Sequence, residues 1–288
     1  MDEVIAVTGA TGAVGGRVAR LLSERGIAPR LIVRDPDRAP ELRLAEVRTA
    51  PGYGASEAMR AALAGVTTLF LVPAAETEDR VEQHHAAIDA AVAADVRRIV
   101  YLSFLDAAPD STFTLVHHHW ATEEHIRRAG VAFTFPRMNL YLDFVPGMVG
   151  ADGVLAGPAG DGRVAMVARA DVADVVVTLL TTDGHDGRVY DVTGGEALTL
   201  EEVAAVLSDL AGTRIAYKDE TLEEAWASRA GYGAPDWQVE AWISTYTAIA
   251  AGELARVTDT VERLAGRPPT TLAEYVRTHP DCLDHVHR

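Results

Sequence analysis

The segment best suited to chemistry is VTGATGAVGG, residues 7–16, in which a glycine recurs at every third position. It follows the apolar run EVIAVT and precedes an amphipathic run over residues 12–25, which predicts a strand, a turn and a helix. In this setting the first glycine permits a tight turn, the second lets a pyrophosphate approach the backbone, and the third lets the helix pack closely on the sheet. The free N–H groups at the start of the helix favour phosphate. The sequence therefore predicts a dinucleotide site, with a glycine-rich turn that binds nothing as the alternative; the residues expected to bind the cofactor are Gly9, Thr11, Gly12, Ala13, Val14 and Gly15.

The end of the second expected strand bears on the choice between NAD and NADP. The chain reads VRDPDR here, with Arg34 ahead of Asp35 and Pro36. An acidic side chain at this place binds the ribose hydroxyls of NAD, whereas an arginine accommodates the 2′-phosphate of NADP. We expect Pro36 to turn Asp35 away from the ribose, so Arg34 favours NADPH over NADH. A solvated charge at the strand end is the alternative role for Arg34.

Short apolar runs alternate with amphipathic stretches through the first half of the chain. This rhythm predicts parallel βαβ units with helices on both faces of one sheet. The apolar runs are nearly continuous, as expected for strands that are buried on both sides. We therefore predict an α/β fold with a doubly wound, mostly parallel Rossmann sheet. The expected strands are residues 3–8, 29–34, 67–72, 97–102 and 131–135, and the expected helices are residues 12–25, 55–64, 77–94 and 120–129.

The alternation of short strands and helices ends after Arg137, which predicts two domains. Residues 1–136 are expected to form the NAD(P)-binding Rossmann domain, and residues 137–288 a smaller, mainly helical C-terminal lobe for the substrate. The chain is expected to cross back and add a late strand near residues 188–192. Residues 147–162 are rich in Gly, Pro and Asp, which predicts a loop or a lid rather than core.

Composition excludes several classes of function. The net charge of −16 argues against nucleic acid and anionic membranes as partners, because binding phosphate backbones needs clustered Lys and Arg. No apolar tract is long enough to cross a bilayer, and the acidic start MDEVIAVTGA does not resemble a signal peptide. Cys282 is the only cysteine, so no intramolecular disulfide can form and we expect a reducing, cytoplasmic setting.

Several segments together resemble the NmrA-like group of atypical short-chain dehydrogenase/reductases, in particular its NADPH-dependent quinone oxidoreductase-like members. The resemblance covers nearly the whole chain, and the segments that carry it are TGATGAVG, VRDPDR, VRRIVYLSF, HWATEEHIRRAGVAFTFPR, RADVADVV, GRVYDVTGGEALTLEEVAAVL and LAGRPPTTLAEYV. Against the family pattern, Asp95 stands where a helix-ending glycine is usual, and Pro136 is expected to stiffen the chain just before the substrate lobe. Asp tolerates the left-handed conformation that such a position requires.

The resemblance implies an NADPH-dependent oxidoreductase that transfers hydride to a quinone-like or conjugated carbonyl small molecule, expected to be flat and apolar. The group also includes regulators, so a non-catalytic NADP(H)-binding redox sensor acting on a protein partner is an alternative. A non-redox isomerase or cyclase on the same fold is another, because fold alone does not settle function. A homo-oligomer is compatible with each of these functions.

The proton donor cannot be the Tyr-x-x-x-Lys pair of the best-known short-chain dehydrogenases. Lys218 is the only lysine, and Arg214 stands four residues before it. Instead, the corresponding helix carries His119 and Glu123, which share one helical face at this spacing. A carboxylate near the imidazole would raise its pKa and make His119 a proton donor, with Glu123 as its partner. A structural tie within the helix is the alternative, and Tyr141 is the second candidate for the donor.

The remaining site candidates lie where expected strands end, because open α/β sheets bind ligands at their carboxyl edge. Val72 and Pro73 are expected to line the cofactor groove, and Ser103 to bond the nicotinamide ribose or a substrate carbonyl, unless it only caps its strand. By the resemblance, Arg137 belongs to the floor of the nicotinamide pocket.

No metal site is expected, because consecutive helical residues in the run 117–119 diverge by about 100° each. His84 falls on the buried stripe of its helix, where a packing role is expected.

Overall fold

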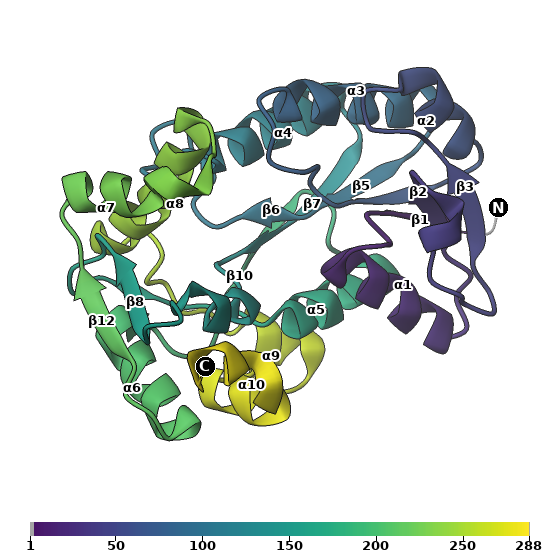
Figure 1. The fold of residues 1–288 in the computed structure, drawn as a ribbon. Helices are drawn as coiled ribbons and strands as arrows, with labels where there is room; N and C mark the ends of the chain where they lie inside the picture. Colours follow the sequence, from purple (N-terminus) through teal and green to yellow (C-terminus); the bar gives the residue numbers. More distant parts are fainter. Residues whose placement is uncertain (1–2, 288) are drawn as a thin grey trace.

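The computed structural model describes residues 3–287 and is built on one eight-stranded sheet (Figure 1). Its order is β10-β7-β5-β4-β1-β2-β3, β6 also pairs with β7, and every pair is parallel. The doubly wound, mostly parallel sheet predicted from the sequence is therefore confirmed. The strands are β1 (Ile5–Thr8), β2 (Arg30–Val33), β3 (Glu46–Thr49), β4 (Thr68–Leu71), β5 (Arg98–Tyr101), β6 (Ser103–Phe104), β7 (Ala132–Met138) and β10 (Arg188–Val192).

Helices cover both faces of the sheet (Figure 1). On one face, α1 (Ala13–Glu24) and α5 (Arg169–Thr181) share a core with β1 and β2, and α9 (Thr260–Ala265) packs against α5. On the other face, α2 (Ser56–Ala62), α3 (Arg80–Ala93) and α4 (Val116–Ala129) share a core with β4 and β5. The central strands are buried from both sides, which explains their continuous apolar sequence.

Two local features show how single residues fit this sheet. Asp95 follows α3 with φ of 61°, the left-handed conformation expected for a residue in the place of a helix-ending glycine. The strand predicted over residues 131–135 continues through Pro136, which was expected to precede the lobe. On one side, β7 pairs with β5 up to Thr134 and with β6 from Arg137 onward. Pro136 lies in the gap between these two pairings, where its missing N–H costs no hydrogen bond on that side.

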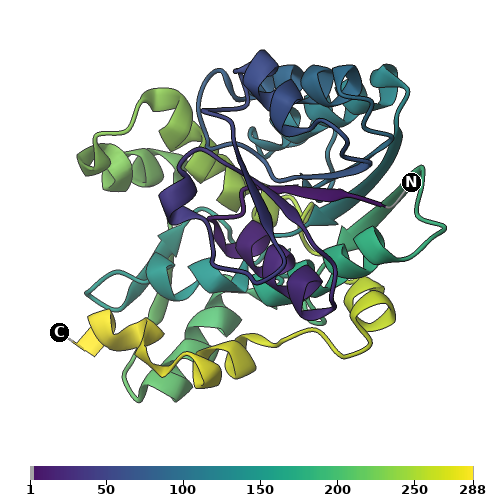
Figure 2. The same cartoon turned by 90° about the vertical axis from the view of Figure 1, so that its right-hand side faces the viewer.

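A second group of elements lies beyond the β6 and β7 end of the sheet (Figure 1), and α7 and α8, in light green, project to the left in Figure 2. Two small sheets join distant segments, because β8 pairs with β12 and β9 pairs with β11. These elements are β8 (Val154–Gly157), β9 (Arg163–Val164), β11 (Leu198–Thr199), α6 (Leu200–Ala211), β12 (Ala216–Asp219), α7 (Leu222–Arg229), α8 (Asp236–Ala250) and α10 (Leu272–Thr278). Short 3-10 turns complete the chain at Pro36–Arg38, Leu142–Phe144, Pro146–Met148, Ala230–Tyr232 and Pro280–His287.

The expectation of a loop or lid over residues 147–162 is wrong. This segment contains β8, and Leu155 is fully buried in the core of the C-terminal elements. Two of its glycines serve close packing: a Cβ on Gly157 would overlap the ring of Tyr246, and one on Gly162 would overlap the carbonyl of Ile249. Composition alone cannot separate these two uses of glycine, since both need a missing side chain.

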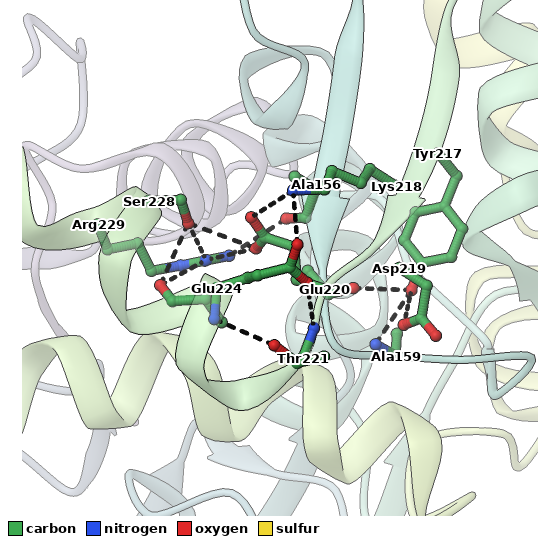
Figure 3. Close-up of polar contacts among 12 residues, drawn as sticks. Ala156, Ala159, Tyr217, Lys218, Asp219, Glu220, Thr221, Glu224, Ser228 and Arg229 are labelled. Atoms are coloured by element: carbon green, nitrogen blue, oxygen red, sulfur yellow. Dashed lines mark hydrogen bonds and ion pairs between the residues drawn. The ribbon is translucent and has the colours of Figure 1, made fainter.

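A buried ion pair joins β8, β12 and α7 (Figure 3). Arg229, near the end of α7, donates to the carboxylate of Glu220 at 2.9 Å and to the carbonyl of Ala156 at 3.2 Å. Both side chains are almost fully buried, whereas Lys218, which pairs with Glu224 at 3.4 Å, is about half exposed. Because the Lys218–Glu224 pair is well solvated, it contributes little to stability, and the buried Arg229–Glu220 pair contributes more to holding these elements together.

We expect Arg229→Ala to lower the free energy of unfolding by about 3 kcal/mol, because it leaves the buried Glu220 carboxylate without its guanidinium partner. The matched control Lys218→Ala removes an exposed charge and should cost less than about 1 kcal/mol. Urea unfolding of both variants measures the difference. Equal losses would contradict the assignment of the link to Arg229.

Candidate functional site

The glycine turn after β1 is shaped by contacts that exclude side chains. Gly9 has φ of 61°, and Gly12 donates its N–H to the Gly9 carbonyl at 2.9 Å. A Cβ on Gly15 would overlap that same carbonyl, so α1 approaches β1 as closely as backbone allows. Gly12 is the N-cap of α1, and the first turn of this helix carries no acidic residue. The turn therefore presents free N–H groups without a competing carboxylate, which suits a bound phosphate.

A cavity of about 370 Å³ lies against this turn. Arginines from α1 and from the segment after β2 form its charged part, and no Asp or Glu is among its lining residues within the described chain. This charge is notable in a chain of net charge −16 and suits a phosphate group. The lining residues are Ala10, Thr11, Gly12, Ala13, Gly16, Arg17, Arg20, Arg38 and Pro40.

The residues after β2 form a short capped turn. Asp35 accepts a hydrogen bond from the Asp37 N–H at 3.1 Å and so caps the short turn Pro36–Arg38. Its carboxylate is engaged locally, while Arg34 and Arg38 are exposed beside it. Of these two arginines, Arg38 lines the cavity. The signal for Arg38 was present in VRDPDR, but strand-end position alone pointed to Arg34.

A second cavity, of about 720 Å³, shares Ala13, Arg17 and Arg20 with the first and so adjoins it along α1. It extends to Arg169 at the start of α5 and to Arg267. The Arg267 guanidinium lies 2.6 Å from carboxylates of α5, which neutralise it. Neither Arg17 nor Arg20 was singled out from the sequence, although GGRVAR places both on the first turns of a helix that begins at a phosphate-binding turn.

The segment after β4 packs against the glycine turn. The Val72 side chain packs against Gly9, where an added Cβ would lie 3.0 Å from the Val72 Cβ. The Val72 N–H donates to Thr8 Oγ1 at 2.9 Å, and the Tyr53 hydroxyl donates to the Val72 carbonyl at 2.6 Å. Val72 and Pro73 thus stand at the carboxyl edge beside the glycine turn, where the sequence placed them. Burial raises the pKa of Tyr53 to about 12, so its hydroxyl stays protonated and donates.

The expected partnership of His119 and Glu123 is not formed. Glu123 is fully buried and accepts hydrogen bonds from Ser103 Oγ at 2.6 Å and from Arg137 Nη2 at 2.6 Å. Arg127 adds a third contact at 3.0 Å. The carboxylate is directed to β6 and β7, where two guanidinium groups compensate its burial, and this outweighs the shared helical face. Ser103 and Arg137 are engaged in the same network, so here these two predicted cofactor residues join strands to α4.

His119 is buried and neutral. Its Nδ1 lies 3.0 Å from the Tyr101 hydroxyl, and burial, with the Arg80 charge as a further cause, holds its pKa well below the ordinary value. The prediction that a carboxylate raises the pKa of His119 is therefore wrong. Neighbouring histidines point elsewhere: His117 Nε2 lies 2.8 Å from the Ser111 carbonyl, and α4 begins before all three, at Val116 instead of near residue 120.

Within residues 3–287, no three His, Cys, Asp or Glu side chains gather as a metal site would require.

Tyr141 follows β7 at the same edge of the sheet. Its backbone bridges to Val167, and the Arg169 guanidinium lies 4.9 Å from its ring centroid. Burial raises the pKa of the Tyr141 phenol well above its ordinary value, so the hydroxyl carries its proton. Asn139, two residues earlier, is buried and donates to the Leu254 carbonyl at 2.9 Å, which anchors this segment to the C-terminal elements.

Comparison with known proteins agrees with this geometry. The family model described as the NmrA-like family matches residues 1–275. The chain belongs to the NmrA-like family. It is similar to the NAD(P)H azoreductase of Xenophilus azovorans, with 34% identity over 280 residues that cover 96% of this chain and 98% of the relative. The family predicted from the sequence is thus confirmed.

Solved structures of two other proteins resemble this NmrA-like chain over nearly its whole length. One is an NADPH-dependent quinone oxidoreductase from Escherichia coli complexed with NADPH, with a TM-score of 0.87 and 34% identity over 96% of this chain and 99% of that one. The other is the Citrobacter sp. triphenylmethane reductase complexed with NADP(H), with a TM-score of 0.86 and 31% identity over 95% and 99% of the two chains. Within residues 3–287, no helix of this NmrA-like protein has the length and apolarity that crossing a bilayer would need.

The neutral state of His119 has a measurable consequence for stability. Because its folded-state pKa lies below the ordinary 6.5, the unfolded chain binds more protons in mild acid, and stability falls as pH drops below about 6.5. We expect His119→Phe to reduce this fall by about 1 kcal/mol between about pH 6.5 and 5.5, since the unfolded imidazole is half protonated at the upper end of this window. Urea unfolding between about pH 6.5 and 5.5 measures the slope. The exposed-site variant His279→Gln is the control, and a wild-type slope in His119→Phe would contradict the assignment.

Proposed function

We propose that this NmrA-like chain is an NADPH-dependent oxidoreductase that delivers hydride to a quinone-like or conjugated carbonyl small molecule. The observation that carries the proposal is the close turn at Gly9, Gly12 and Gly15 beside a cavity lined by arginines. The named relatives support it, since the azoreductase uses NAD(P)H and the quinone oxidoreductase was solved with NADPH. A flat, apolar acceptor, a cytoplasmic location and self-association are parts of this proposal that rest on the sequence alone.

Different residues are assigned to the phosphate groups and to the nicotinamide of the cofactor. The N–H groups of the turn and of the first α1 residues bind the pyrophosphate, and Arg38 with Arg17 binds the 2′-phosphate. Val72 and Pro73 form the wall toward the nicotinamide end. When bound, the reduced nicotinamide supplies the hydride, and the protein contributes orientation and exclusion of water.

The proton for the reduced oxygen has a candidate source in Tyr141. Glu123 is held by two arginines and His119 is neutral and buried, so the acid predicted from this pair is not assembled. The Tyr141 phenol is protonated and stands at the carboxyl edge of the sheet. We therefore assign Tyr141 the role of a hydrogen-bond donor to the acceptor oxygen.

The direct test of the activity is NADPH oxidation by the purified protein against quinones, conjugated enones and azo dyes, with NADH in parallel. Turnover with a preference for NADPH supports the proposal. Tight NADPH binding without turnover on any acceptor would contradict it and favour a sensor or a non-redox enzyme.

Arg38→Ala should raise the KM for NADPH by about tenfold or more, because a charge-assisted hydrogen bond to phosphate contributes about 1.5–3 kcal/mol. The KM for NADH should change by less than about threefold, since NADH lacks the 2′-phosphate. Arg43→Ala removes an exposed arginine on the same loop and is the control. An equal effect of Arg38→Ala on both nucleotides would exclude Arg38 from phosphate recognition.

Tyr141→Phe should lower kcat by about a hundredfold for an enone, whose reduced oxygen needs a proton early, and by less than about tenfold for a quinone. The reason is that a hydroquinone anion is stable enough to be protonated later. Steady-state rates with both acceptors, together with the NADPH dissociation constant, measure this split. A uniform loss on both acceptors, or an equal loss of NADPH affinity, would contradict the assigned role.

A further inference from the structure

The segment Val72–Ala74 is held by contacts from α3 as well as from β1. The Ala74 N–H donates to His84 Nε2 at 2.9 Å, and the Ala74 carbonyl accepts from Arg80 Nε at 3.0 Å. Both polar groups of Ala74 are thus bonded to one helix. His84 is fully buried and Arg80 nearly so. The position of the segment beside the glycine turn therefore depends on two buried side chains of α3.

The bonds of His84 define its tautomer. A backbone N–H can only donate, so Nε2 must be the unprotonated acceptor and Nδ1 must carry the proton. Nδ1 lies 2.8 Å from Thr122 Oγ1, and the Thr122 hydroxyl in turn donates to the His118 carbonyl at 2.7 Å. Since the Thr122 proton is used there, its oxygen is free to accept from Nδ1. Because Nε2 accepts from Ala74 and Nδ1 donates to Thr122, these hydrogen bonds require a neutral His84.

The surroundings of His84 bring no carboxylate that would favour the charged form, as far as the described chain goes. Burial, with the Arg80 charge and then His118 and His85 as lesser causes, holds the pKa of His84 well below its ordinary value. The rings of Tyr53 and Tyr101 face it at centroid distances of 6.2 and 5.8 Å. The titratable and charged groups around it are Arg80 and His85 from α3, His118 and His119 from α4, Tyr101 from β5, and Tyr53.

We propose that His84 is a positioning residue for the cofactor groove, and that its Nδ1–H tautomer latches the Val72–Ala74 wall beside the glycine turn. Protonation of Nε2 would place two donors opposite each other at the Ala74 bond and would release the wall. The inference rests on the proposed function to the extent that the cofactor binds against this wall. It adds a dependence of cofactor affinity on the protonation of a residue that does not touch the cofactor.

The first experiment uses the wild-type protein without cofactor. Long-range ¹H–¹⁵N correlation spectra distinguish the two neutral tautomers and the imidazolium of each histidine, and the His84 signals are assigned with His84→Gln. We expect the Nδ1–H tautomer at neutral pH. An Nε2–H tautomer would overturn the inference whatever the cofactor does.

The second experiment measures NADP⁺ affinity, because NADP⁺ tolerates mild acid. Dissociation constants for wild type and His84→Gln are compared from about pH 7.5 to about pH 5. The Gln side chain offers a carboxamide oxygen to the Ala74 N–H and does not titrate, so titration of the 2′-phosphate and of carboxylates is common to both proteins. We expect wild type to lose more affinity than His84→Gln at those pH values where the ¹⁵N spectra show protonated His84, which burial confines to the acid end of the titration. Parallel affinities at a pH where the spectra show protonated His84 would overturn the latch.

A second pair of variants keeps the test available if His84→Gln does not fold. Thr122→Val removes the acceptor for Nδ1–H, and Thr122→Ser keeps it. We expect Thr122→Val to weaken NADP⁺ binding several-fold at neutral pH and to deplete the Nδ1–H tautomer, whereas Thr122→Ser preserves both. Equal affinities in this pair would contradict the inference. Absence of NADP⁺ binding to wild type at neutral pH, with the tautomer as expected, would instead overturn the proposed cofactor site and the latch's role in it.

Discussion

The close approach of α1 to β1 is the contact on which the rest of the site depends. Gly15 lies so near the Gly9 carbonyl that no side chain fits between them, and Gly9 itself adopts a left-handed conformation. This contact fixes where the N–H groups at the start of α1 point and where the side chains of its first turns emerge. Arg17 and Arg20 reach the cavity from that position, and Val72 packs on the opposite side of the same turn. One backbone contact thus positions both the arginines of the cavity and the turn against which Val72 packs.

Most of the sheet was predictable because its central strands are continuous apolar runs. Such runs separated by amphipathic stretches admit few arrangements besides parallel βαβ units, and β1, β2, β4, β5, β7 and β10 lie within or close to the expected ranges. The edge strand β3 was missed because all four of its residues are exposed and form no apolar run. The glycine turn was predictable for a related reason, since a missing Cβ at every third position after a strand has a specific steric use. Pro36 likewise begins the short turn that the Asp35 carboxylate caps.

The predictions that were wrong concern contacts between segments distant in sequence. His119 and Glu123 share a helical face, but Glu123 pairs with Arg137 from β7, and no helical spacing reveals that partner. Likewise, Gly157 and Gly162 are typical of a loop in sequence, but α8 packs directly against both. Arg38 and Arg17 became visible as a pair only when the fold brought the turn after β2 beside α1. Short-range patterns thus predict elements and turns, whereas the partners of buried charges need the tertiary structure.

Calorimetric titration of the full chain with NADPH and with NADH tests most directly whether the arginine-lined cavity beside the glycine turn binds NADPH. We expect NADPH to bind at one site per chain, at least about tenfold tighter than NADH because of the contacts to the 2′-phosphate. Equal affinities would contradict the role of the arginines. Absence of binding by either nucleotide would contradict the assignment of the glycine turn itself.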